Sequence, residues 1–424
     1  MKKIYLDHSA TTPVDKAVLK AMEPYWLKNF GNSSSLHSFG QEAIRGVDKA
    51  RKQCADYFKC ESAEITFTSG ATEANNLAIK GLFKAFNSEG YKNKNLHAIT
   101  SIVEHDAVLE PFMELEKSGT AITHLPVNKV AVVEVEKLIV AIQENTVLVS
   151  IMWVNSEIGS IMPIKKLAKA VYKERERRTR EWKKLGKNER TEKPLPIYFH
   201  TDATQAVNFF DCNIKDNYID LLSFSGHKIY GPKGVGALFV RDGIRLEALQ
   251  RGGHHEKNLR SGTLNVSGIV GLGAAVSIKN KKLSAQGGPA LGWRIKNNEY
   301  IGNLRDRLVK GVKKNIPDVV LNTNRDVSTP AHAHFSFIGI EGEALLLALD
   351  LEGIAVSTGS ACASGSLKAP HVLIAMGIDK EIANYSIRFS LGKFNTKEEI
   401  NIVIEKLVEI VKRLRKMNPI YKNI

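Results

Sequence analysis

Short apolar stretches alternate with amphipathic segments along the first two thirds of the chain. The apolar stretches are rich in Ile, Val and Phe. Strands that are separated by helices form βαβ units around a parallel sheet. The pattern therefore predicts an α/β fold with a mostly parallel sheet flanked by helices, in a large domain over residues 15–265. The expected strands cover residues 64–68, 96–102, 147–154, 197–202, 221–225 and 236–240.

The pattern changes after Gly271, where longer amphipathic segments begin. Three short β-like stretches follow at residues 333–340, 354–357 and 386–391. We interpret residues 1–14 and 266–424 as a second, smaller α+β domain. The last helix is expected to begin at a capping box, Thr396 to Glu399, and to carry apolar residues at helical spacing: Ile400, Val403, Leu407, Ile410 and Leu414.

Composition is typical of a globular protein. The 424 residues are 43% hydrophobic and 25% charged, and no apolar run approaches the ~18 to 20 residues of a membrane-spanning helix. Asp7 and His8 stand where a signal peptide would carry its apolar region, so we expect a cytoplasmic protein. The four cysteines are scattered without a CxxC pair, which argues against a disulfide framework and a Cys-rich zinc site.

The net charge is +15, from 60 Lys and Arg against 45 Asp and Glu. Residues 173–193 hold ten Lys or Arg and five Glu, and so supply +5 of it. This basic stretch fits a solvated helical insertion with i,i+4 ion pairs, or a docking surface for an acidic partner or RNA. Its one aromatic residue is Trp182, so a base-stacking platform for RNA is not supported.

The strongest chemical signal is the segment Ser-Phe-Ser-Gly-His-Lys-Ile-Tyr-Gly-Pro-Lys-Gly at residues 223–234. It places Lys228 in a turn of small residues at the end of an apolar stretch, where α/β proteins put their sites. Burial disfavours the charged ammonium, and a neutral lysine amine can form a Schiff base with an aldehyde. The natural partner is pyridoxal phosphate. On this segment alone, a surface loop lysine is the alternative.

A second segment, Thr-Ser-Gly-Ala-Thr-Glu-Ala-Asn-Asn at residues 68–76, follows an apolar stretch and opens a helix. Its small residues let backbone N–H groups approach a phosphate, the helix N-terminus adds partial positive charge, and the Thr72 hydroxyl can donate. It lacks the lysine of a Walker loop, so a nucleotide-binding loop fits poorly. A helix-capping Ser/Thr cluster is the alternative.

Asp202, Gln205 and His105 also follow apolar stretches. Asp202 could bond a protonated pyridine nitrogen, and Gln205 the phenolic oxygen of the same ring. His105 could stack on the ring and shuttle protons, since imidazole titrates near neutrality. Alone, Asp202 is equally an N-cap and His105 a structural histidine. An amine, a phosphate cradle and a carboxylate at three strand ends together indicate a cofactor site.

These motifs resemble the cysteine desulfurase family of fold-type I pyridoxal-phosphate enzymes, within the class V aminotransferase superfamily. The resemblance is to its iron–sulfur-assembly and nitrogenase-maturation branch, runs over nearly the whole chain, and implies a seven-stranded sheet. It rests on Tyr-Leu-Asp-His-Ser-Ala-Thr-Thr-Pro at 5–13, Gly-Ala-Thr-Glu at 70–73, Asn-Ser-Glu-Ile-Gly at 155–159, Ser-Gly-His-Lys at 225–228 and Arg-Ser-Gly-Thr at 260–263.

The segment that separates desulfurases from aminotransferase relatives is Ser-Thr-Gly-Ser-Ala-Cys-Ala-Ser-Gly-Ser at residues 357–366. Small residues around Cys362 give a flexible loop that can bring a thiolate to a substrate sulfur and carry a persulfide away. A free cysteine is more often buried and inert. Here the loop composition and the resemblance favour a catalytic thiol.

The resemblance implies conversion of L-cysteine to L-alanine with a persulfide formed on Cys362. Lys228 and His105 would move protons, and Asn155 and Arg388 would hold the substrate carboxylate, a task that suits a guanidinium. Sulfur would pass to acceptors such as an iron–sulfur scaffold or tRNA-thiolation carriers. The implied cofactor-binding residues are Ala71, Thr72, His105, Asn155, Asp202, Gln205, Ser225, His227, Lys228 and Thr263, the last of them reaching across from the other subunit of a homodimer.

Three departures from the family pattern remove no group that the chemistry needs: Ser156 for a second Asn, Asn-Ser-Ser-Ser at 32–35, and His-His-Glu at 254–256. The basic stretch is longer than the family pattern, which leaves the partner open. The alternatives within enzymes are a selenocysteine lyase and another pyridoxal-phosphate lyase. The alternative outside enzymes is a basic scaffold or RNA-binding module. An aminotransferase is disfavoured because of Cys362. We expect no membrane role and no direct nucleic-acid binding. We also expect no metal site, because the histidine pairs His254–His255 and His332–His334 lack a third ligand of clear spacing.

Overall fold

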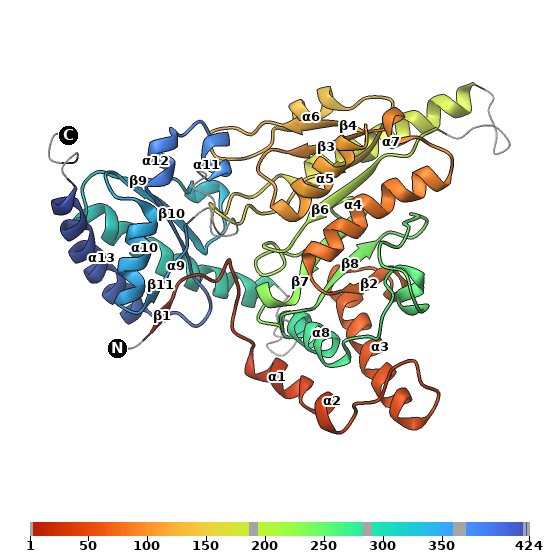
Figure 1. The fold of residues 1–424 in the computed structure, drawn as a ribbon, viewed down its shortest axis with the longest axis horizontal. Coiled ribbons are helices and arrows are strands. Elements are labelled where there is room, and N and C mark those ends of the chain that lie inside the picture. Colours follow the sequence, from red (N-terminus) through yellow and green to blue (C-terminus); the bar gives the residue numbers. More distant parts are fainter. Residues whose placement is uncertain (1–2, 186–193, 282–290, 359–369, 419–420, 422–424) are drawn as a thin grey trace.

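The computed structural model describes residues 3–185, 194–281, 291–358, 370–418 and 421. Within them a large body is built on a central seven-stranded sheet, and a smaller body stands at one end of it (Figure 1). Only β8 runs against its neighbours, and the other six strands are parallel. The sheet order is β2 (Ile65–Thr68), β8 (Gly236–Val240), β7 (Leu221–Ser225), β6 (Tyr198–Asp202), β5 (Thr146–Ser150), β3 (His97–Ser101) and β4 (Ala121–Leu125).

Six of these strands were predicted from their apolar runs, because each is buried on both faces. Parallel sheets covered by helices on both sides produce such continuous hydrophobic stretches. The edge strand β4, Ala-Ile-Thr-His-Leu, is mostly half-buried or exposed and was not predicted. The mostly parallel α/β fold is confirmed.

Helices cover both faces of the sheet (Figure 1). Alternate side chains of β7 enter opposite cores. Leu222 and Phe224 pack in a cluster with α3 (Ser38–Phe58) and α8 (Val266–Lys281), whereas Leu221 packs in a cluster with α4 (Ala71–Ser88) and α5 (Asp106–Lys117). In the described part of the chain, no helix combines the length and apolar character needed to cross a membrane. The helices of this body are α1 (Lys16–Met22), α2 (Pro24–Leu27), α3 (Ser38–Phe58), α4 (Ala71–Ser88), α5 (Asp106–Lys117), α6 (Val135–Ala141), α7 (Ile164–Lys184) and α8 (Val266–Lys281).

The smaller body has a core of its own, in which Phe335 and Phe389 of the sheet pack with Leu407 of the last helix. The chain start joins it, because β1 (Ile4–Tyr5) pairs with β11 (Ile354–Ala355). The last helix begins at the predicted Thr396 capping box. The elements are the antiparallel sheet β12 (Ser386–Ser390), β10 (His332–Phe337) and β9 (Val319–Leu321), with helices α9 (Leu291–Asn315), α10 (Gly342–Leu351), α11 (His371–Ala375), α12 (Lys380–Asn384) and α13 (Lys397–Met417).

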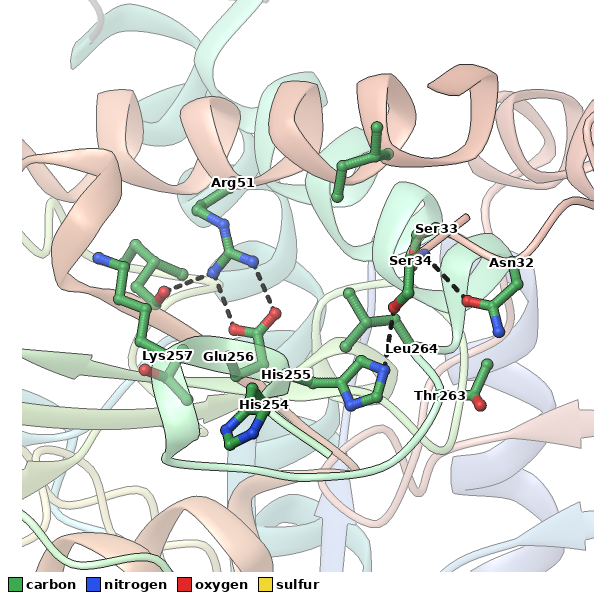
Figure 2. A pocket seen from close by; sticks show the side chains of 13 residues that line it. Asn32, Ser33, Ser34, Arg51, His254, His255, Glu256, Lys257, Thr263 and Leu264 are labelled. Carbon is green, nitrogen blue, oxygen red and sulfur yellow. Dashed lines mark hydrogen bonds and ion pairs between the residues drawn. The ribbon is translucent and has the colours of Figure 1, made fainter. Parts of the chain in front are cut away.

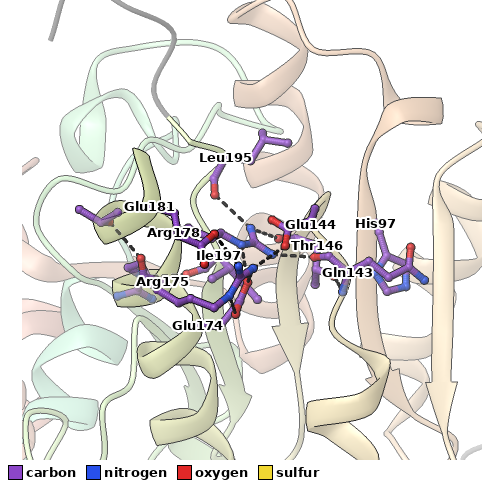
Figure 3. A network of polar contacts seen from close by, with 12 residues as sticks. His97, Gln143, Glu144, Thr146, Glu174, Arg175, Arg178, Glu181, Leu195 and Ile197 are labelled. Atoms are coloured by element: carbon purple, nitrogen blue, oxygen red, sulfur yellow. Dashed lines mark hydrogen bonds and ion pairs between the residues drawn. The ribbon is translucent and has the colours of Figure 1, made fainter. Parts of the chain in front are cut away.

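Part of the basic stretch is helical and contains a buried arginine. Helix α7 continues through it as far as residue 184, and residues 186–193 lie outside the described residues. Arg178 is only 5% exposed and donates to the carbonyls of Gln143, Thr146 and Leu195 at 2.6, 2.9 and 3.0 Å (Figure 3). Its Nε also donates to Glu174 at 2.8 Å. This arginine therefore ties α7 to the start of β5 and to the segment just before β6.

Replacing Arg178 by methionine is expected to lower the free energy of unfolding by about 3 kcal/mol, because three buried carbonyls lose a charged donor. Urea denaturation followed by circular dichroism measures the change. Arg180→Met is the matched control, since Arg180 is exposed on the same helix, and it should change the free energy by less than about 0.5 kcal/mol. Equal effects of the two substitutions would show that the buried contacts contribute no special stability.

Candidate active site

Lys228 lies in a short turn (Gly226–Lys228) at the end of β7, as predicted. Its Nζ contacts the carbonyl of Ser9 and donates to the carbonyl of Ala10 at 2.8 Å. The Gln205 side chain, which follows β6, donates to the same Ser9 carbonyl at 2.9 Å. Residues 7–12, which we call the N-terminal segment, therefore bring these two side chains together.

His227 and Ser225 flank the same turn. The His227 carbonyl accepts from the Thr12 backbone N–H at 2.9 Å and from its hydroxyl at 2.8 Å. Burial, together with the positive charges of Lys228 and Lys233, lowers the pKa of His227 to about 4, so its imidazole is neutral at physiological pH. The Ser225 hydroxyl is buried and has no hydrogen-bond partner among the described residues, which leaves it available for a ligand.

The N-terminus of α4 lies next to Ser225. Ser225 pairs with Gly236 on β8, and a Cβ on Gly236 would lie 2.7 Å from the Cα of Gly70, the residue before α4. Only glycine at 236 permits this approach. Among the residues that the structure describes, no side chain caps α4, and none occupies the space where a Gly70 side chain would stand. Ala71 and Thr72 form the first turn of α4, with Thr72 exposed, so the N-terminus of a helix lies beside a buried hydroxyl.

Asp202 lies at the end of β6 and is 7% exposed. Its Oδ1 accepts from the Thr204 N–H at 2.9 Å, and its Oδ2 accepts from Asn75 Nδ2 at 2.7 Å. Asn75 is fully buried on α4, one turn after Ala71, so the helix that presents the phosphate cradle also orients the carboxylate. Asn75 was not predicted, although its i,i+4 spacing from Ala71 was a usable signal.

His105 is the N-cap of α5, and its Nδ1 accepts from the Ala107 N–H at 3.0 Å. This contact places the proton of the neutral imidazole on Nε2. The preceding Glu104 is fully buried, and accepts from the Ser101 hydroxyl at 2.6 Å and from the Met152 N–H. Burial, with a smaller contribution from the charge of Asp202, raises the pKa of Glu104 to about 8. Glu104 was not predicted, because an acidic residue in a polar triplet gives no sign of burial.

Asn155 and Arg388, predicted to hold the substrate carboxylate, differ in what they offer. The Asn155 side chain is buried, accepts from the N–H groups of Glu157 and Ile158, and donates to the Val103 carbonyl at 3.1 Å, so it supports its own turn. Arg388 lies on β12 with its Nε buried and without a hydrogen-bond partner among the described residues. A buried guanidinium N–H in that state favours binding of an anion.

Thr263 is not part of this cluster within the chain. It is exposed and lines a surface cavity of about 550 Å³ with Ser34, His254 and His255 (Figure 2). Glu256 closes one side of the cavity by a bidentate ion pair with Arg51, at 2.6 and 2.9 Å. Within the described ranges, no three His, Cys, Asp or Glu side chains are grouped to hold a metal ion. Cys362 falls in 359–369, outside the described residues.

The residues present fit pyridoxal phosphate. The Ser225 hydroxyl and the start of α4, which have no side-chain partner among the described residues, suit a phosphate. Asp202, held by two donors, suits a protonated pyridine nitrogen, and Lys228 and Gln205 converge on one carbonyl nearby. The set offers an amine, an anion cradle and a fixed carboxylate from three neighbouring elements, as such a cofactor requires.

Comparison with known proteins gives consistent results. The class-V aminotransferase family model matches residues 4–176 and 181–403. Cysteine desulfurase IscS of Clostridium botulinum is 43% identical over all of this chain and 98% of its own length. The human cysteine desulfurase is 40% identical over all of this chain and 85% of its own length. A solved NifS-like protein superimposes with a TM-score of 0.83, at 34% identity, over 97% of this chain and all of its own.

The chain therefore belongs to the class V aminotransferase family, whose fold and pyridoxal phosphate cofactor match the site described above. Within that family it is a member of the cysteine desulfurases, since its similarity to them extends over its full length. The family model leaves out residues 177–180, which lie inside the basic stretch.

Proposed function

We propose that this enzyme takes sulfur from L-cysteine, releases L-alanine, and carries the sulfur as a persulfide on Cys362. The Cβ–Sγ bond of the substrate breaks, and a bond forms between its sulfur and Cys362 Sγ. The electron pair of the broken bond stays on Cβ, which takes up a proton and becomes the methyl group of alanine. The observation that carries the proposal is the convergence of Lys228, Gln205 and Arg388 on the N-terminal segment, in a chain of this family.

The residues at the strand ends would bind the cofactor. Ser225, His227 and the first turn of α4, Ala71 and Thr72, would hold its phosphate, with neutral His227 able to donate one hydrogen bond. Asp202 and Gln205 would hold the ring. When bound, pyridoxal phosphate withdraws electrons from the carbon skeleton of an attached amino acid, which allows the substrate Cα to lose a proton.

Lys228 and His105 would move protons. The Lys228 amine stands at the turn after β7, where it would anchor the cofactor and then exchange a proton with the substrate Cα. The Nδ1 of His105 accepts a hydrogen bond at the start of α5. Its Nε2 is therefore the atom that would donate a proton to the substrate and later accept one from it. The fixed tautomer supports assignment of His105 as a general acid.

Arg388 would bind the substrate carboxylate through its buried Nε. Arg388→Lys is expected to raise the KM for L-cysteine about 10- to 100-fold, because an ammonium cannot form the two parallel hydrogen bonds of a guanidinium. Steady-state alanine production measures this, and the visible absorbance of the bound cofactor should not change. Arg305→Lys is the control, since Arg305 is also 6% exposed in the smaller body; a similar KM for the two variants would exclude Arg388 from substrate binding.

A homodimer would complete the site. Thr263 stands apart from the strand ends and faces a surface cavity, which suits a hydroxyl that reaches the phosphate of a second subunit. Large apolar side chains near the cavity-lining Ser33 and Ser34 are exposed in the single chain, as expected of a surface that pairs: Trp26, Leu27, Phe30, Leu36 and Phe39. The persulfide would serve sulfur acceptors, such as an iron–sulfur scaffold or tRNA-thiolation carriers.

A further inference from the structure

The Arg388 guanidinium is held at two of its three nitrogens, and the third has no hydrogen-bond partner among the described residues. Its Nη1 donates to the Ser156 carbonyl at 3.0 Å, and its Nη2 donates to Asp7 Oδ1 at 2.7 Å. Nε is buried and has no hydrogen-bond partner among the described residues. Arg388 as a whole is only 6% exposed, so this unmade hydrogen bond is unfavourable until a ligand supplies an acceptor.

Nε and Nη2 together form the side fork of a guanidinium, which binds one carboxylate through two parallel hydrogen bonds. Asp7 accepts from Nη2 through a single oxygen. It therefore holds one position of the fork, whereas the other, Nε, has no acceptor among the described residues. A carboxylate that takes both positions gains a hydrogen bond that Asp7 does not make.

The Asp7 side chain is not what anchors the N-terminal segment to β12. Main-chain hydrogen bonds do that: Ser390 N–H donates to the Leu6 carbonyl at 2.8 Å, and His8 N–H donates to the Ser390 carbonyl at 3.1 Å. The Ser390 hydroxyl adds a third contact by accepting from Ser9 N–H at 2.9 Å. The Asp7 carboxylate, with 17% of its side chain exposed, can thus be displaced from Arg388 without release of the segment.

We propose that Asp7 is a resident competitor for the carboxylate position on Arg388 and thereby a determinant of substrate specificity. This inference rests on the proposed role of Arg388 in substrate binding. A carboxylate that arrives alone must overcome the negative charge of Asp7. An amino acid that is also held at its amine has a high local concentration at the fork, and displaces Asp7. Asp7 makes Arg388 selective for amino acids over simple carboxylates.

The test compares two probes on the cofactor-loaded enzyme. 3-Mercaptopropionate has the thiol and carboxylate of cysteine without its amine, and cysteamine has the thiol and amine without the carboxylate. In Asp7→Asn, the inhibition constant of 3-mercaptopropionate should fall about tenfold, while that of cysteamine stays within about twofold. The KM for L-cysteine should fall about threefold, and kcat should change by less than about twofold.

Three variants separate the possible results. Asp15→Asn is the matched control, because Asp15 pairs with Lys393, and it should leave both inhibition constants unchanged. Asp7→Glu keeps the charge and should keep the wild-type constants within about threefold. If thermal denaturation shows that Asp7→Asn does not fold, Asp7→Ser takes its place in the comparison.

A weaker 3-mercaptopropionate complex and a higher KM in Asp7→Asn would overturn the inference, since Asp7 would then orient Arg388 instead of competing at it. The proposed function is tested apart from this by Arg388→Lys, which should lose 3-mercaptopropionate binding by at least about tenfold. Unchanged binding there would remove Arg388 from the site. Introduced on top of Arg388→Lys, Asp7→Asn should have no effect on this inhibitor.

Discussion

Lys228→Ala will lower desulfuration of L-cysteine by at least about 1,000-fold, because it removes the side chain that we propose as both the cofactor anchor and the base at the substrate Cα. The purified variant will also lack the visible absorption that a lysine-bound pyridoxal phosphate gives. The short turn after β7 places this lysine against the Ser9 and Ala10 carbonyls, within the convergence that defines the site. Absorbance spectra and alanine release measure the two effects.

Lys233→Ala is the matched control for that experiment. Lys233 lies in the same Gly- and Pro-rich loop but is exposed, so its loss should leave the absorption band in place and activity within about threefold of the wild type. Normal absorption and normal turnover in Lys228→Ala would contradict the assignment of the catalytic lysine. Loss of both properties in Lys233→Ala as well would indicate damage to the loop.

Cys362→Ser will keep the absorption band and lose sulfide production by on the order of 1,000-fold or more, because serine cannot accept a sulfur atom from the substrate thiol. This result separates sulfur transfer from cofactor binding within one variant. Sulfide release from L-cysteine in the presence of a thiol reductant gives the measurement. Normal sulfide release would mean that the cofactor assignment stands and the persulfide mechanism does not.

Cys60→Ser is the control for a general effect of thiol loss. Burial, with a smaller contribution from Glu64, raises the pKa of Cys60 to about 12, and burial raises that of Cys54 to about 12 also. Both thiols are therefore protonated and unreactive at neutral pH. Sulfide production in Cys60→Ser should remain within about twofold of the wild type.

The fold was predictable where burial of an element produces a recognisable pattern of apolar residues in the sequence. Six strands of the central sheet are continuous apolar runs because helices cover both faces. The edge strand β4 was missed because it is mostly half-buried or exposed, and Thr123 and His124 interrupt its apolar pattern. The strand β9, Val-Val-Leu, was missed because it has only three residues. The basic stretch was interpreted as a solvated helical insertion or a docking surface, and α7 does run through it as far as Lys184. The buried hydrogen bonds of Arg178 within it were not predicted. The domain boundaries at residues 14 and 265 stay a prediction.

The candidate site was predictable where chemistry needs a particular side chain at a strand end. Lys228, Asp202, Gln205 and Ser225 fall into that group. Asp7, Asn75 and Glu104 were not predicted as parts of it, because each acts through another residue or through burial. The Asp7 to Arg388 contact joins residues 381 positions apart, and no local pattern encodes such a pairing. The sequence alone therefore did not predict that the N-terminal segment folds across the strand ends.

The measurement that tests the account most directly is a mass spectrum of the peptide containing Cys362, taken from cofactor-loaded enzyme after brief exposure to L-cysteine without reductant. The account predicts that this peptide gains the mass of one sulfur atom, that a reductant removes the gain, and that alanine appears in equal amount. Peptides containing Cys54, Cys60 and Cys212 should not change. Alanine formed while the Cys362 peptide keeps its original mass would contradict the account.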